Sequence, residues 1–165
     1  SYTYLNDAWD NMINIENNRS GCPVSTSLEI IGDSWTLLII RDLFLERNTF
    51  KDFINSPEKI SSNVLTDRLK KLIKNDIISY FIDPRDKKIK KYYLTDAGIA
   101  LFPMIYNLSM WSKIHLKMRF NGVATEWYEE NQNKNSDDVI ADSINGYKLF
   151  RSELLSQAQN HKMAI

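Results

Sequence analysis

The sequence has few of the residues from which metal and redox sites are usually built. Among its 165 residues, Cys22 is the only cysteine, and His115 and His161 are the only histidines. A single cysteine excludes an internal disulfide. One thiol and two imidazoles cannot hold a structural zinc ion unless several carboxylates complete the site. We therefore expect no metal site.

Glycine is also scarce, and its positions exclude the common nucleotide-binding motifs. None of the five glycines lies in a GxGxxG motif or a phosphate-binding loop, and no GxSxG motif occurs. The acidic pairs of the chain lie in polar sequence, where a solvated loop is the simpler interpretation than acid–base catalysis. We expect no catalytic residues, no cofactor and no enzymatic activity.

Long hydrophobic runs are missing as well. No stretch of about 18 apolar residues is present, so we expect no membrane span and no membrane partner. Residues 1–4 do not start a basic region followed by an apolar stretch, so no secretory signal is expected. Together with the single cysteine, this favours a cytoplasmic protein.

The net charge is zero, but the charges are segregated along the chain. Residues 61–91 carry nine basic and four acidic side chains, whereas residues 1–60 carry five basic and nine acidic ones. A neutral protein with one basic segment can bind a polyanion locally. A solvated charged face is the alternative, and charge alone does not decide between them.

Hydrophobic periodicity predicts a mainly helical chain with one β-hairpin. At 43% hydrophobic residues, the composition supplies a core of ordinary size. The expected helices cover residues 2–15, 23–31, 35–45, 49–54, 61–74 and 95–119, and the expected strands cover residues 77–82 and 87–94. Residues 123–165 have enough apolar positions for one or two more helices, with a polar linker over 131–138 and frayed last residues.

The order of a short helix, a capped helix and a basic hairpin is typical of a winged helix-turn-helix. The second helix of such a unit enters the DNA major groove and reads bases with polar side chains near its start. The residues suited to this role are Ser61, Ser62, Asn63, Thr66, Arg68 and Lys70. The hairpin tip offers side chains suited to phosphate or minor-groove contact, namely Arg85, Lys87, Lys88 and Lys90.

Two other interpretations of this unit stay open. The amphipathic helix and the hairpin also fit an ordinary α+β domain with a solvated face. A winged helix can further serve in protein–protein contact alone, and salt-dependent binding to double-stranded DNA would distinguish a regulator from such a module.

The sequence resembles the HxlR-type winged-helix regulators from about residue 22 to residue 115. Five segments carry the resemblance in the right order: CPV at 22–24, IGDSWTLLIIRDL at 31–43, FKDF at 50–53, ISSNVLTDRLKKL at 60–72 and YYLTDAG at 92–98. The resemblance implies a bacterial, dimeric, DNA-binding repressor or activator. The chain departs from the family pattern at Ser34, where a basic residue is usual, at Ile73, where an acidic residue is usual, and at Asp76, where glycine is usual.

A homodimer is expected from the terminal helices. A stripe with three-four spacing, typical of a helix–helix seam, is formed by Leu101, Met104, Leu108, Trp111, His115 and Met118. The first predicted helix needs a partner surface for Tyr4, Leu5, Trp9 and Ile13. A monomer's own core could use the same stripe, and Pro103 should kink the helix that carries it.

Cys22 precedes Pro23 and is expected at the N-cap of a helix. Backbone amides and the helix dipole favour a thiolate there, and some members of the resembled family sense oxidants or electrophiles through an N-terminal cysteine. The alternative is an inert cysteine that packs behind Trp35. A small-molecule or oxidant effector is left unidentified.

The predicted fold is mainly α with a small β-hairpin (α+β). We divide the chain into an N-terminal helical arm for dimer contact (1–20), a winged helix-turn-helix domain with a long C-terminal helix (21–120) and a C-terminal helical extension with a flexible end (121–165).

Overall fold

The computed structural model describes Met12, Ile13, Ile15 and residues 20–163. The helices of this part are α2 (Pro23–Ile31), α3 (Thr36–Phe44), α4 (Phe50–Ile54), α5 (Ser62–Lys74), α6 (Asp96–Ile99), α7 (Phe102–His115), α8 (Gly122–Asn131) and α9 (Ser136–Met163). The strands β1 (Ile78–Ile82) and β2 (Lys90–Leu94) pair antiparallel, with Ile78 opposite Leu94 and Ile82 opposite Lys90. The predicted mainly helical fold with one hairpin is confirmed.

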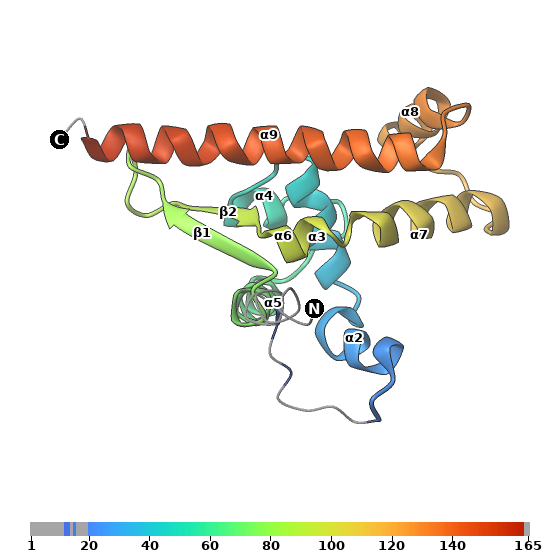
Figure 1. The fold of residues 1–165 in the computed structure, drawn as a ribbon, viewed down its shortest axis with the longest axis horizontal. Coiled ribbons are helices and arrows are strands. Elements are labelled where there is room, and N and C mark those ends of the chain that lie inside the picture. Colours follow the sequence, from blue (N-terminus) through green and yellow to red (C-terminus); the bar gives the residue numbers. More distant parts are fainter. Residues whose placement is uncertain (1–11, 14, 16–19, 164–165) are drawn as a thin grey trace, which may run out of the picture.

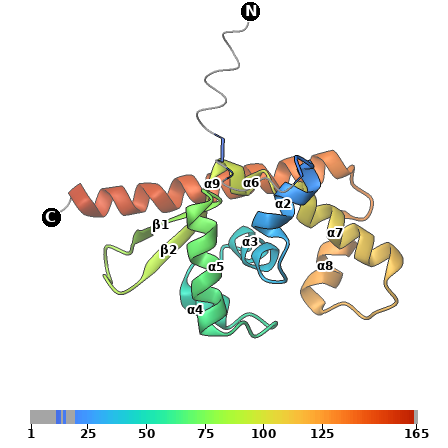
Figure 2. The same ribbon diagram turned by 90° about the horizontal axis from the view of Figure 1, so that it is seen from below.

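The long helix α9 lies along one side of the molecule, and α5 lies on the other side of α3 (Figure 1). Seen from below, α4, α5 and the hairpin occupy one half of the structure, and α7 and α8 occupy the other (Figure 2). The helix α3 lies between the two halves and contacts both β2 and α7. It has the apolar character that this central position requires, since its Ile40 and Leu43 have no exposed surface.

Helix α5, the second helix of the predicted helix-turn-helix, is amphipathic, and its buried stripe consists of leucines. Leu65, Leu69 and Leu72 recur at helical spacing and pack into the core with Ile40 and Leu94. The helix ends at Lys74 with Asn75 as its C-cap, and the next residue, Asp76, has a φ of 52°. An aspartate tolerates this left-handed conformation, so the helix turns into β1 without the glycine that the family usually has there.

The expected helix over 95–119 is wrong in its continuity and its end. Thr95 caps α6 as expected, because its hydroxyl accepts a hydrogen bond from the Gly98 amide. The α-helix then breaks over residues 100–101 and restarts with Pro103 in its first turn, where a missing N–H costs nothing. It ends at His115, so Met118 lies beyond it.

The first predicted helix falls mostly outside the described residues. Tyr4, Leu5 and Trp9 lie there, so the structure does not test their assignment to a dimer contact. Met12, Ile13 and Ile15 are described and are not helical. Ile13 is half-buried and packs against the core of its own chain.

The C-terminal extension packs onto the winged helix through α9. Tyr147 is 4% exposed and belongs to the same core cluster as Leu65 and Leu94. The Leu94 N–H donates to the Tyr147 hydroxyl (2.9 Å), and Arg151 donates to the Leu94 carbonyl (2.9 Å) and to Asp96 (2.7 Å). The helix continues to Met163. It therefore extends into the last residues of the sequence, which we expected to be frayed. Among the described residues, no helix is long and apolar enough to cross a membrane.

We expect Tyr147→Phe to lower the free energy of unfolding by about 1–3 kcal/mol, because the buried Leu94 N–H loses its acceptor. Burial raises the pKa of Tyr147 to about 12, so the neutral hydroxyl is the acceptor throughout the working range of pH. Urea denaturation followed by circular dichroism measures the change. The control is Leu149→Ala, an exposed position on the same helix. Equal stability of the two variants would contradict a structural role for the hydroxyl.

Candidate nucleic-acid interface

The start of α5 presents short polar side chains to solvent. Ser61 is the N-cap, and its hydroxyl accepts from the Val64 amide (3.4 Å). Most of the residues chosen from the sequence are exposed, namely Ser61, Ser62, Asn63 and Thr66 near the start of α5 and Lys70 further along it. Because the leucine stripe faces the core, this polar face is turned away from it, as a helix that reads a DNA groove requires.

The hydroxyl of Thr66 is already engaged with the helix. It donates to the carbonyl of Ser62 (2.8 Å), which leaves its lone pairs and its methyl group available to an external partner. Asn63 is exposed and makes no hydrogen bond through its side chain to any other described residue. Asn63 is therefore the free amide on this face, with both a donor and an acceptor to offer a base edge.

Arg68 does not share the exposed face with Asn63 and Lys70. Its guanidinium lies 3.5 Å from the carboxylate of Asp33 and is only partly exposed. Asp33 also caps α3, because its carboxylate accepts from the amides of Trp35 and Thr36. This arrangement makes Arg68 a link between α5 and the start of α3.

Asp33 and Asp83 hold the backbone at two places, the start of α3 and the tip of the hairpin. The hydrogen bonds that Asp33 accepts hold its pKa below the ordinary value in spite of its burial, which alone would raise it. Asp83 is 6% exposed and accepts from the Arg85 amide (2.9 Å), which is the main reason that its pKa is lowered. Both carboxylates therefore remain charged acceptors that fix the backbone around them.

The hairpin tip carries the predicted basic side chains in exposed positions. Arg85, Lys87, Lys88 and Lys90 are all exposed, with the ammonium of Lys90 over the ring of Tyr80 (4.3 Å from its centre). The strand β2 begins only at Lys90, so Lys87 and Lys88 belong to the tip rather than to the predicted strand. A loop with several long cationic side chains suits contact with phosphates better than the reading of bases.

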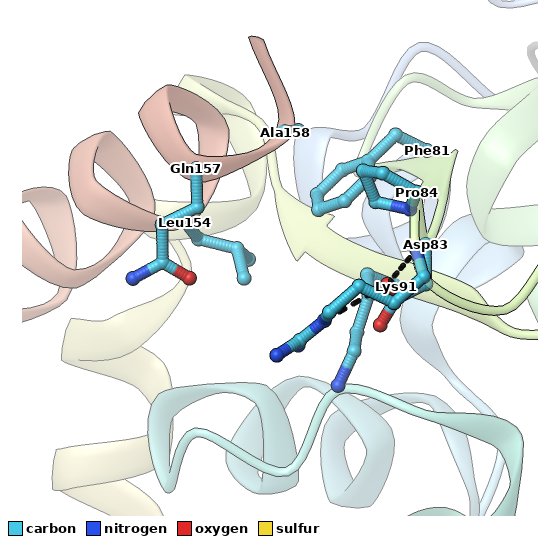
Figure 3. A pocket seen from close by; sticks show the side chains of 8 residues that line it. Phe81, Asp83, Pro84, Lys91, Leu154, Gln157 and Ala158 are labelled. Atoms are coloured by element: carbon cyan, nitrogen blue, oxygen red, sulfur yellow. Dashed lines mark hydrogen bonds and ion pairs between the residues drawn. The ribbon is translucent and has the colours of Figure 1, made fainter. Parts of the chain in front are cut away.

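The tip of the hairpin rests beside the C-terminal part of α9. A shallow cavity of about 270 Å³ separates Phe81, Pro84 and Lys91 from Leu154, Gln157 and Ala158 (Figure 3). Because α9 is anchored at Tyr147 and Arg151, it supports the hairpin from behind. No sequence signal predicts this contact, since α9 belongs to the extension that no motif explains.

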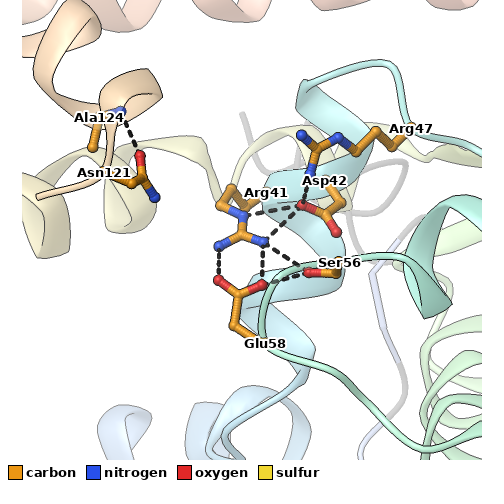
Figure 4. Close-up of polar contacts among 7 residues, drawn as sticks. All are labelled: Arg41, Asp42, Arg47, Ser56, Glu58, Asn121 and Ala124. Atoms are coloured by element: carbon orange, nitrogen blue, oxygen red, sulfur yellow. Dashed lines mark hydrogen bonds and ion pairs between the residues drawn. The ribbon is translucent and has the colours of Figure 1, made fainter.

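A polar cluster fixes the turn that leads into α5. Arg41 donates to both carboxylate oxygens of Glu58 (2.7 and 3.1 Å) and to Asp42 (2.8 and 3.1 Å), and Ser56 also hydrogen-bonds to Glu58 (Figure 4). The Asp42 side chain is almost fully buried. Since Glu58 lies three residues before the N-cap of α5, Arg41 connects the turn that leads into α5 to α3.

The face of α7 that we expect in a dimer is exposed and apolar. Its exposed side chains are Met104, Leu108, Trp111 and Ile114, and His115 stacks beside Trp111 (5.6 Å between ring centres). Met118, just beyond the helix, is also exposed. Leu101 differs, because it is half-buried and packs against the core.

Cys22 is the N-cap of α2, as predicted, and it is exposed. Its thiol makes no capping hydrogen bond. The alternative in which it packs behind Trp35 does not agree with this exposure. Among the described residues, no cluster of three or more histidine, cysteine and acidic side chains could hold a metal ion.

Comparisons with known proteins place the same segment among regulators. The sequence profile of the HxlR-like helix-turn-helix family matches residues 30–120. The chain is 30% identical over 93 residues to the helix-turn-helix-type transcriptional regulator YdeP of Bacillus subtilis, which covers 56% of this chain and 73% of YdeP. It is 29% identical over 92 residues to the regulator YodB of the same organism, covering 55% of this chain and 82% of YodB.

Among solved structures, the fold is similar to that of PA1607, described as a candidate transcription factor. The TM-score is 0.56 at 30% sequence identity, and the match covers 63% of this chain and 72% of PA1607. The family match spans α3 to α7 together with the hairpin and leaves out α8 and α9.

We expect Glu58→Gln to lower the free energy of unfolding by about 1 kcal/mol at pH 7, a modest value because the carboxylate is partly exposed. Hydrogen bonds from Arg41 lower the pKa of Glu58 from 4.5 to about 2. A lowered pKa stabilises the fold above pH 4.5, and that contribution is lost as the pH falls towards 2.

Urea denaturation at several pH values measures this difference. The gap between the parent and the variant should therefore shrink below pH 4.5. The control is Glu153→Gln, an exposed carboxylate on α9, which should change the stability little at any pH. A gap that stays constant from pH 7 to pH 3 would show that the Arg41–Glu58 contact does not stabilise the fold.

Proposed function

Since this chain belongs to the HxlR-like helix-turn-helix family of transcriptional regulators, we propose that it binds a pseudo-palindromic DNA operator as a homodimer and represses transcription in the cytoplasm. The observation that carries the proposal is the pairing of two exposed surfaces. Helix α5 presents its polar start to solvent and contacts β1, the first strand of a hairpin whose tip carries exposed cations. The family relationship likewise supports a regulator and not an enzyme.

We assign different tasks to the two surfaces. Asn63 and Thr66 read base edges in the major groove, because Asn63 is unengaged and Thr66 keeps free lone pairs. Ser61, Ser62 and Lys70 contact bases or phosphates nearby, and Arg85, Lys87, Lys88 and Lys90 of the wing contact phosphates or the minor groove. Arg68 acts by positioning α5 against Asp33 rather than by direct contact.

We expect the double variant Arg85→Ala, Lys88→Ala to bind every duplex more weakly and to flatten the dependence of log K on log salt, by about one unit of slope for each phosphate that is no longer neutralised. In contrast, Asn63→Ala should change which sequences are preferred, at about 1–3 kcal/mol for the base that the amide would otherwise read. Fluorescence anisotropy with duplexes from the DNA that flanks the gene measures both effects across a salt series.

The control for these variants is Lys134→Ala, an exposed lysine in the turn between α8 and α9. It should leave both affinity and salt slope unchanged. If the wing variant kept its full affinity and slope, the wing assignment would fail. If the parent protein showed no salt-dependent binding to any duplex, a module for protein–protein contact would replace the regulator.

The homodimer is proposed from the exposed apolar face of α7. Trp111 is 54% exposed and Leu108 is 50% exposed, and together with the residues beside them they form a stripe that a second copy could cover. A two-fold axis through this stripe would place two α5 helices for two half-sites of one operator. We further propose that residues 1–20 join this contact, that residues 21–120 form the DNA-binding unit and that residues 121–165 support it.

We expect the parent protein to sediment as a dimer at micromolar concentration and Leu108→Glu, Trp111→Glu to sediment as a monomer, because two charges per chain would be buried in an apolar contact. Leu149→Glu, at an exposed leucine on α9, is the control and should remain dimeric. A parent protein that is monomeric at this concentration would remove the basis for the two-fold operator.

We also propose Cys22 as a redox-sensing residue. Its exposure at the N-cap of α2 gives reagents access to the thiol. The rate of its alkylation across a range of pH, compared with the response of Cys22→Ser to oxidants, tests this role.

A further inference from the structure

A cavity of about 340 Å³ lies between the winged helix and the extension. Its walls come from α3, from the turn before α5, from α7 and from the first turns of α8. This volume is in the range of small-molecule sites in proteins. The family match ends at residue 120, so the wall that α8 contributes belongs to the part of the chain that the family relationship leaves out.

Aromatic rings make up much of the wall. Phe44 packs against Phe102 with 4.7 Å between ring centres, and Tyr106 meets Trp127 edge to face at 5.8 Å. These four rings line the cavity together. Faces and edges of this kind favour a flat ring that can stack or pack edge-on between them.

The polar groups of the wall are mostly donors. The Tyr106 hydroxyl and the Trp127 indole N–H make no hydrogen bond to other described residues. Arg47 has one ion-pair contact, 3.4 Å from Asp42, and its side chain is 39% exposed. Arg41 also lines the cavity, and Glu58 is the only acidic side chain in the described wall. Asp42 and Glu58 balance the charges of the two arginines, but the wall keeps unused donors, which match a ligand with acceptor oxygens.

We propose that this cavity binds a small aromatic carboxylate. The ring packs among Phe102, Tyr106 and Trp127, and the carboxylate lies on Arg47 and on the neighbouring Arg41. An arginine can hold a carboxylate through two parallel hydrogen bonds, and Arg47 has the unused N–H groups for this. Figure 4 shows Asn121 and Ala124, at the start of α8, across from the Arg41 guanidinium.

Binding at this place connects to the DNA-binding surface through Arg41. The same guanidinium that borders the cavity holds Glu58, three residues before the Ser61 N-cap. A carboxylate that draws hydrogen bonds from Arg41 competes with Glu58 and loosens the turn that fixes the start of α5. The effect of this competition on DNA binding rests on the proposed function. We expect a lower affinity for operator DNA when the cavity is filled.

The test uses 2-naphthoate as the probe and 2-naphthamide as its neutral counterpart, with the full chain and no DNA. Isothermal titration should show one 2-naphthoate site per chain and at least tenfold weaker binding of 2-naphthamide. Arg47→Gln should weaken 2-naphthoate at least tenfold and leave 2-naphthamide unchanged. Ala124→Phe should abolish binding of both, because it fills the cavity from α8, whereas Ala141→Phe, on the exposed surface of α9, should bind like the parent.

The proposed site would be overturned if 2-naphthoate showed no saturable binding, or if the acid and the amide bound equally well. It would also be overturned if binding survived in an Ala124→Phe variant with the thermal stability of the parent. Equal weakening in Ala124→Phe and Ala141→Phe would also overturn it, because the effect would then not come from the cavity.

A second arm measures duplex binding by anisotropy with and without 2-naphthoate. We expect saturating probe to weaken binding at least fivefold in the parent and not in Arg47→Gln. If the parent binds no duplex even without probe, the proposed function fails while the titration result still decides the cavity. If the parent binds DNA with unchanged affinity when the probe occupies the cavity, the connection through Arg41 fails.

Discussion

The burial of the leucine stripe on α5 is the constraint on which the rest of the structure depends. Leu65, Leu69 and Leu72 are essentially unexposed, and a helix of 13 residues has only one face that can carry such a stripe. Once that face packs into the core, Asn63 and Lys70 must lie on the outside. The polarity of the interface is thus a consequence of core packing, and no separate interaction is needed to turn the polar side chains outwards.

Burial fixes the rotation of α5, but other features fix its ends. At the C-terminal end, Asp76 takes the left-handed conformation that leads into β1. Arg68 ties the middle of the helix to Asp33 at the start of α3, and Arg41 ties the preceding turn to α3 through Glu58. Both arginine contacts lead to α3, so the motif over residues 31–43 contains side chains that hold α5 in place.

Local patterns are enough to predict the hairpin, the capped start of α5 and the exposed cations of the wing, because each depends on residues close in the sequence. Three features are beyond them. Arg68 is grouped with the reading face because helical spacing alone does not reveal a partner 35 residues away. The break before Pro103 is expected only as a kink. The contact of Tyr147 with Leu94 joins residues 53 apart and follows no motif, so neither the supporting role of α9 nor the cavity beside α8 can be foreseen.

The contact between Tyr147 and Leu94 also bears on the order in which the parts of the molecule fold. Tyr147 and Arg151 complete the hydrogen bonding of Leu94 on the side of β2 that does not face β1, and they come from near the end of the chain. During synthesis, α3, α5 and the hairpin emerge before α9, so we expect them to bury their leucines against one another before the Leu94 amide gains its acceptor. We therefore expect α9 to dock after the hairpin has closed, because a contact of such high sequence separation forms slowly relative to hairpin closure. In that interval we expect the leucine stripe to place the polar face of α5 while the hairpin still lacks the support of α9.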